Sequence, residues 1–189
     1  MPATAEGTNH DSTEMTAILR ARLTGQPLWE FALALYGQPG VESACLALQD
    51  QARVDVCELL WRCWLLRHGV VPGPTAEEGL VEVLRWQREV TAPLRRLRRR
   101  LKPEANVRPG VAELRETLKH AELQAERETL DRLERLALAD SSTALTPAPS
   151  AGVRAADKVL ANALGLQKKT HLSTLHTLVA SLDPPSRPR

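Results

Sequence analysis

Six basic residues lie within eight consecutive positions in the middle of the chain. They are Arg95, Arg96, Arg98, Arg99, Arg100 and Lys102. Guanidinium and ammonium groups bind phosphate and carboxylate oxygens, so this segment could contact a nucleic-acid backbone or another anionic partner. Between Arg85 and Lys102 the chain has eight cations and one anion, Glu89, which gives a local charge of +7.

The same cations could instead be neutralised within the protein. Residues 113–134 have seven acidic and four basic side chains, a net charge of −3, and an antiparallel neighbour would bring these carboxylates beside the arginines. Exposed ion pairs are worth only about 0–1 kcal/mol each, so the arginines could exchange them for phosphates at small cost. Apart from Trp86, no aromatic residues lie among the arginines, which argues against recognition of single strands by base stacking. Internal pairing and anion binding both stay open.

Two pairs of possible metal ligands at helical spacing raise the question of a metal site. They are Glu116 with His120 and Glu122 with Glu126, each four residues apart. A di-metal site in a helical bundle needs a Glu-x-x-His motif on each of two helices, and the sequence lacks this arrangement. We therefore predict a solvated helix face and no metal ligands.

The three cysteines offer no recognisable catalytic pattern. Cys45, Cys57 and Cys63 all fall within apolar periodic segments, and their spacing matches neither a redox nor a zinc motif. We expect reduced, buried thiols in a cytoplasmic protein. Phosphate-binding glycine loops and nucleophile elbows are also missing. The sequence thus predicts no catalytic residue and no cofactor, and it favours a protein that is not an enzyme.

The composition favours an all-α protein. Leu, Ala, Glu and Arg are abundant, and these residues lose little entropy in a helix. Aromatic residues make up only 3% of the chain, whereas strands favour aromatic and β-branched side chains. We predict a compact bundle of about five helices with a long antiparallel hairpin, followed by a C-terminal helical pair.

Apolar periodicity and capping residues place these helices. The spacing predicts a short buried helix over Leu28–Tyr36, a second from Val41 to Leu48, and a third, central helix that starts after the cap Asp55 and ends at Arg67. Thr75 and Glu78 form a capping box that predicts the start of the next helix.

Two long helical stretches should form the hairpin. The first runs from Leu80 to Leu101, with Leu97 and Leu101 facing inward, and the second from Val111 to Leu138. Pro93 interrupts the first stretch, because it lacks an N–H and its ring clashes with the carbonyl of the residue four positions earlier. A kink and a restart of the helix at Pro93 are both compatible with the sequence.

Composition shifts divide the chain into five segments. We predict a flexible lead-in over residues 1–26, a helical domain over 27–140, a linker over 141–152, a short helical pair over 153–183 and a tail over 184–189. The longest apolar run, Leu28–Tyr36, falls well short of the roughly 20 residues that a membrane span requires. No membrane span is expected.

Four tryptophans are predicted to anchor the core: Trp29, Trp61, Trp64 and Trp86. A ligand pocket lined by them is the less favoured alternative.

The segment from Leu28 to Gly69 reads LWEFALALYGQPGVESACLALQDQARVDVCELLWRCWLLRHG. The order LW-x-FALALY, PGV, ACL-x-LQD and DV followed by LLW resembles an uncharacterised proteobacterial family of small helical proteins, a domain of unknown function. The resemblance continues through Trp86 and a basic stretch to AELQAER, and covers about residues 27–138. Arg53 and Cys57 depart from it, since Gly and Asn are usual there. The resemblance implies a helical fold and no established activity.

Three functional hypotheses follow. The first is a helical interaction or adaptor protein that presents its basic helix to a protein partner. The second is binding to RNA or a ribonucleoprotein through Arg95–Lys102. The third is an enzyme without a recognisable motif. The sequence does not predict the oligomeric state.

Overall fold

The computed structural model describes residues 17–139, 142–149 and 153–182. Almost all the regular structure is helical, which confirms the predicted all-α class. The body contains α2 (Leu28–Tyr36), α3 (Val41–Ala52), α4 (Val56–Arg67), α9 (Val153–Ala163) and α10 (Lys169–Val179). The hairpin contains α5 (Pro74–Trp86), the π-helix η1 (Gln87–Thr91), α6 (Ala92–Arg100), α7 (Lys102–Ala105) and α8 (Pro109–Ala137). Within the described ranges, no helix has the length and apolarity needed to cross a membrane.

Helix α4 lies at the centre of the body and is buried on almost every side. Its cap is the one that the sequence predicts, since Asp55 accepts a hydrogen bond from the Glu58 backbone N–H at 2.9 Å. Trp61 and Trp64 are fully buried in this helix, and the Trp64 indole donates to the Gln26 carbonyl at 2.8 Å. Helix α4 therefore supplies the core around which the other elements pack.

The other two tryptophans lie nearer the surface. Trp29 is half-buried, and the guanidinium of Arg127 lies 5.2 Å from the centre of its ring. Trp86 is also half-buried, with Arg132 at 4.1 Å from its ring and its indole N–H donating to the Ala125 carbonyl. Both rings thus combine partial packing with a cation–π contact.

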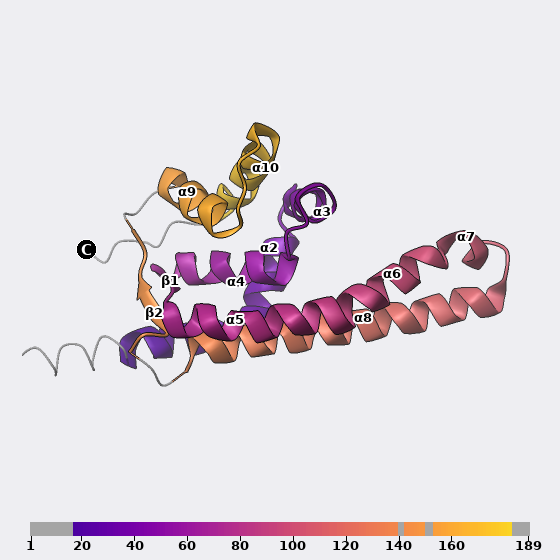
Figure 1. Ribbon diagram of the computed structural model, residues 1–189, viewed down its shortest axis with the longest axis horizontal. Coiled ribbons are helices and arrows are strands. Elements are labelled where there is room, and N and C mark those ends of the chain that lie inside the picture. Colours follow the sequence, from indigo (N-terminus) through magenta and orange to yellow (C-terminus); the bar gives the residue numbers. More distant parts are fainter. Residues whose placement is uncertain (1–16, 140–141, 150–152, 183–189) are drawn as a thin grey trace, which may run out of the picture.

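The predicted antiparallel hairpin is confirmed, and Figure 1 shows it extending well beyond the body. Pro93 lies in the first turn of α6, directly after η1. The Ala92 N–H donates to the carbonyl of Gln87, five residues earlier, so the helix widens by one residue before the proline. The sequence left a kink and a restart open. The chain instead stays helical through a π turn.

A small two-stranded sheet joins two segments whose pairing the sequence did not predict. Strand β1 (Val70–Pro72) pairs antiparallel with β2 (Leu145–Pro147), which lies inside the expected linker. The Gly73 N–H donates to the Ala144 carbonyl at 2.8 Å, and a side chain at Gly73 would collide with the Thr143 carbonyl. The predicted capping box at Thr75 is wrong, because α5 begins at Pro74 with Gly73 as its cap.

The C-terminal pair docks on the body. Helix α10 packs against α3, and α9 packs against α4 and α10. Leu160, Leu175 and Leu178 are fully buried in these contacts. At the other end of the chain, residues 17–24 are helical and Leu23 is buried, so the described part of the expected lead-in also belongs to the fold.

Replacement of Trp61 by Ala should lower the free energy of unfolding by about 3–5 kcal/mol, because it empties the centre of the core. Urea denaturation followed by circular dichroism measures this loss. Trp29→Ala is the matched control, since its half-exposed ring leaves a smaller void. Equal losses for the two variants would contradict the central position of α4.

His68 should make the protein less stable in mild acid. Burial, together with the charges of Arg22 and Arg67, lowers its pKa from 6.5 to about 4. Between these values the unfolded state binds more protons, so the free energy of unfolding falls as pH is lowered from 6.5 towards 4. Urea midpoints at several pH values should show that His68→Gln loses part of this dependence. An unchanged dependence would contradict the shift.

Candidate functional site

The basic cluster lies on an arm that projects from the body. We define the arm as residues 92–123, which include α6, α7 and the facing half of α8 (Figure 1). Neither α6 nor α7 has a buried residue, because only one helix packs against them. The arm is therefore a two-helix structure with both flanks open to solvent.

Two of the six cations face inward across the hairpin. The Arg95 Nε donates to Glu122 at 2.8 Å, and its Nη2 donates to Glu126 at 2.5 Å. Arg98 donates to both carboxylate oxygens of Glu122. Glu122 is itself buried, so this one carboxylate connects two guanidinium groups of α6 to α8.

The pKa values of Glu122 and Glu126 are shifted in opposite directions. Burial alone would raise the pKa of Glu122, but the hydrogen bonds from Arg98 and Arg95 outweigh it and lower the pKa below its ordinary value. For Glu126, burial outweighs its contact with Arg95, and the pKa is raised. Glu122 is therefore the firmly ionised partner of the pair.

The other four cations face outward. Arg99 donates to Asp50 at 3.1 Å in an exposed pair. Arg96, Arg100 and Lys102 are exposed and form no ion pair with any residue that the structure describes. The sequence left internal pairing and anion binding open for the cluster as a whole. The structure divides the cluster, since Arg95 and Arg98 are used internally, whereas Arg96, Arg100 and Lys102 have no ionic partner among the described residues.

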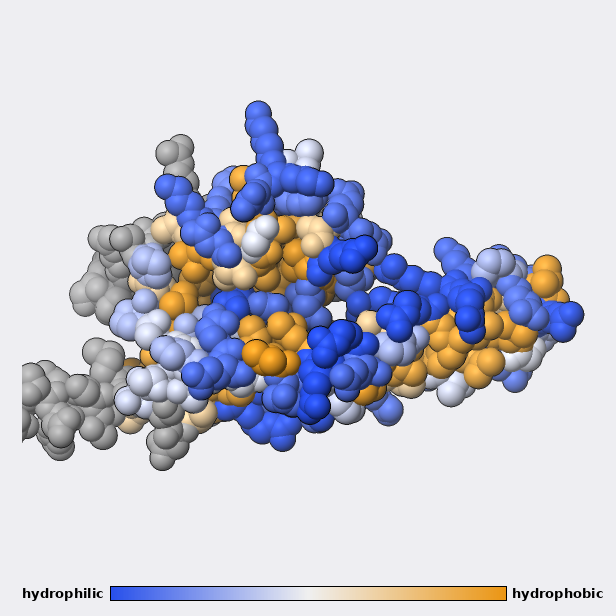
Figure 2. Space-filling model, viewed as in Figure 1, coloured by the Kyte–Doolittle hydropathy of each residue, from blue (hydrophilic) through white to orange (hydrophobic). Residues whose placement is uncertain are grey.

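Apolar side chains accompany the outward cations. Val107 at the tip of the arm is 77% exposed, and Leu114 on α8 is 50% exposed. Leu97 and Leu101, expected to face inward, are only half-buried. Figure 2 shows hydrophobic residues along the arm to its tip, with hydrophilic ones beside them. The arm thus has exposed cations and exposed apolar side chains together.

The carboxylates considered as metal ligands have other partners. Arg95 and Arg98 occupy Glu122 and Glu126, and Glu116 accepts from Lys119 at 3.4 Å. Across the described ranges, His, Cys, Asp and Glu side chains form no group of three that could hold a metal ion.

The thiols are also poorly placed for nucleophilic chemistry. Cys45, Cys57 and Cys63 are buried, and burial raises the pKa of Cys45 to about 12. A thiol with so high a pKa supplies almost no thiolate near neutral pH.

Sequence reasoning missed two buried polar residues at the base of the arm. Gln87 donates its side-chain N–H to Asp55 at 3.2 Å. Thr91 is almost fully buried, and its hydroxyl has no hydrogen-bond partner among the described residues. Both continue the buried stripe of Leu80 and Val83 at spacings of three and four residues. The same helical spacing, continued through polar positions, would have predicted that Gln87 and Thr91 are buried.

Comparison with known proteins identifies a family for this chain. The model of the family described as "Protein of unknown function (DUF2390)" matches residues 27–133, which extend from α2 through most of α8. No curated protein and no solved structure matches the chain.

Replacement of Glu122 by Ala should detach α6 from α8, because Arg95 and Arg98 would lose their shared partner. Breaking a buried ion pair from one side costs about 3 kcal/mol. Urea denaturation should show this loss, and hydrogen exchange should show faster exchange of the α6 amides. Glu116→Ala, which removes an exposed carboxylate paired with Lys119 and Arg115, should change the stability by less than about 1 kcal/mol. Similar effects for both variants would contradict the arrangement.

Proposed function

Because this chain belongs to the DUF2390 family, whose description leaves the function open, we propose a function from the geometry of the arm. The protein is a helical interaction protein, and its arm docks an acidic, amphipathic segment of a partner protein. Its role in this proposal is binding rather than catalysis.

The observation that carries the proposal is the division of the basic cluster. Within the described ranges Arg96, Arg100 and Lys102 have no ionic partner, although α8 offers carboxylates to their neighbours. Three exposed cations on the adjoining helices α6 and α7 repel one another, and an anionic partner relieves that repulsion. The exposed ion pair of Arg99 with Asp50 can be exchanged at small cost.

The apolar residues of the arm favour protein over nucleic acid as the partner. Contacts to a phosphate backbone use cations and polar groups, and they leave exposed residues such as Val107 and Leu114 without a role. An amphipathic helix with acidic flanks would cover these apolar side chains and pair with the cations at the same time. The high density of free cations keeps RNA or a ribonucleoprotein as the second candidate.

Photo-crosslinking from the arm tests the proposal. A photoreactive amino acid at Val107 should crosslink, in a bacterial lysate treated with nuclease, to a segment of a partner that is acidic and amphipathic. The triple variant Arg96→Glu, Arg100→Glu, Lys102→Glu should lose the crosslink by about tenfold or more, since each reversal removes an attraction and adds a repulsion.

A variant with the same charge change elsewhere is the control for this experiment. Lys158, Lys168 and Lys169 are exposed on or beside α9 and α10, and their reversal to Glu should leave the crosslink intact. A crosslink that forms in an untreated lysate and is lost after nuclease treatment, or a crosslink to RNA itself, would favour RNA or a ribonucleoprotein as the partner. Equal loss in both triple variants would count against a specific surface on the arm.

A further inference from the structure

A buried arginine lies between α4 and α5, away from the arm. Only 7% of the Arg62 side chain is exposed. Its Nε donates to Glu58 at 2.8 Å, while Nη1 and Nη2 donate to the two carboxylate oxygens of Glu77 at 2.8 and 3.0 Å. The Glu77 carboxylate thus binds the guanidinium in the bidentate geometry that carboxylates and phosphates share.

This arginine borders open space on the surface of the body. A cleft of about 470 Å³ has Arg62, Glu77 and Glu58 among its lining residues, together with the apolar side chains of Leu80, Val81 and Leu84. A second cavity, of about 210 Å³, shares Arg62 and Glu77 with the first and includes Leu66 and Leu160. The volume of the larger cleft is within the range of small-molecule sites, and its lining combines apolar side chains with charged groups.

The two carboxylates that hold Arg62 differ in accessibility. Glu58 is buried on the same helix, whereas the Glu77 side chain is 45% exposed. The Glu77 carboxylate can therefore move away from Arg62 into water at small cost, whereas the buried guanidinium of Arg62 cannot leave its position. A buried guanidinium left without its second partner is strongly unfavourable, so departure of Glu77 requires another anion in its place.

We propose that this cleft binds a small organic anion, a carboxylate or a phosphate monoester with an apolar body, whose anionic group replaces Glu77 on Arg62. The apolar body then lies against Leu80, Val81 and Leu84. A carboxylate leaves the charge next to Arg62 unchanged when it replaces Glu77, whereas a phosphate monoester adds up to one further negative charge.

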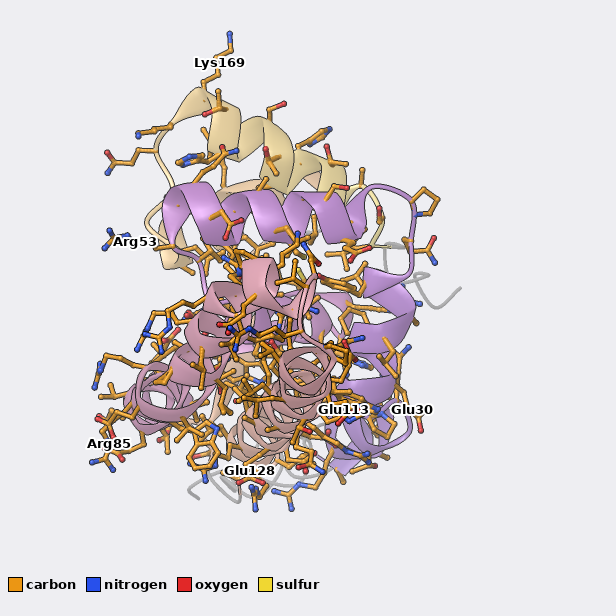
Figure 3. The ribbon with its side chains drawn as sticks, turned by 90° about the vertical axis from the view of Figure 1, so that its right-hand side faces the viewer. Glu30, Arg53, Arg85, Glu113, Glu128 and Lys169 are labelled. Atoms are coloured by element: carbon orange, nitrogen blue, oxygen red, sulfur yellow. The ribbon has the colours of Figure 1, made fainter. Side chains whose placement is uncertain are left out.

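The polar groups of the cleft favour an anion over an amine. The Asp55 carboxylate already accepts from the Glu58 N–H and from Gln87, and Glu58 accepts from Arg62. An ammonium group would have to lie beside the Arg62 guanidinium, and each carboxylate that lines the cleft, Glu77 included, already accepts a hydrogen bond. Arg53 also lines the cleft, and Figure 3 shows it projecting from the same side of the molecule as Arg85 and opposite to Glu30.

Titration of the isotope-labelled protein with hexanoate, hexyl phosphate and hexylamine, followed by NMR, tests the proposal. Glu77→Gln removes the internal competitor, so this variant should bind an anionic probe about tenfold more tightly than the unchanged protein. Hexylamine should not bind. The tighter of the two anionic probes shows which headgroup the cleft prefers. Glu82→Gln is the matched control, because it makes the same charge change on α5 outside the cleft and should bind like the unchanged protein.

Several outcomes would overturn the proposal. One is that Glu77→Gln and Glu82→Gln bind the anionic probes with equal affinity. Another is that hexylamine binds as tightly as hexanoate. A third is that neither anion shows saturable binding. If Glu77→Gln fails to fold, Val81→Asn in the otherwise unchanged protein replaces it. Val81 is exposed at the cleft, so this variant should fold and bind hexanoate several-fold more weakly, and an unchanged affinity would refute the site.

Discussion

The shared carboxylate of Glu122 is the interaction on which the arm depends. A two-helix arm cannot bury its own leucines, because each helix has only one neighbour, and α6 accordingly has no buried residue. The hydrophobic burial that holds α4 in the body is therefore largely missing along α6. Three hydrogen bonds from Arg95 and Arg98 to one buried, firmly ionised carboxylate replace it.

The helical periodicity of the hairpin decides which arginines reach Glu122. The buried stripe of the hairpin continues from Leu80 and Val83 through Gln87 and Thr91, and Arg95 and Arg98 follow at the next helical spacings. These two arginines reach Glu122, whereas Arg96 and Arg100 lie outside the stripe and are exposed. The register of the first helical stretch therefore separates the cations that pair with α8 from those that face solvent.

Much of the fold could be predicted from the sequence, because its signals are local. Helix α2 has the predicted bounds, Asp55 caps α4, and the long apolar repeats form the antiparallel hairpin. The pairing of β1 with β2 could not be predicted, since two three-residue strands some 70 positions apart have no periodicity that stands out from a loop. Thr75 had the residue pattern of a cap, but Gly73, whose N–H donates to the Ala144 carbonyl just before β2, caps α5 two residues earlier.

The candidate sites were harder to predict, because pairing between helices depends on register and not on composition. The +7 charge of residues 85–102 singled out the segment, but it did not distinguish cations that the fold uses in different ways. Arg62 left no comparable signal. Glu58 four residues before it is an ordinary helical pair, while Glu77 and the α9 residues that complete its surroundings come from other parts of the chain. A buried charge becomes recognisable as a binding group only when the accessibility of each partner is known, and that is a property of the packed structure.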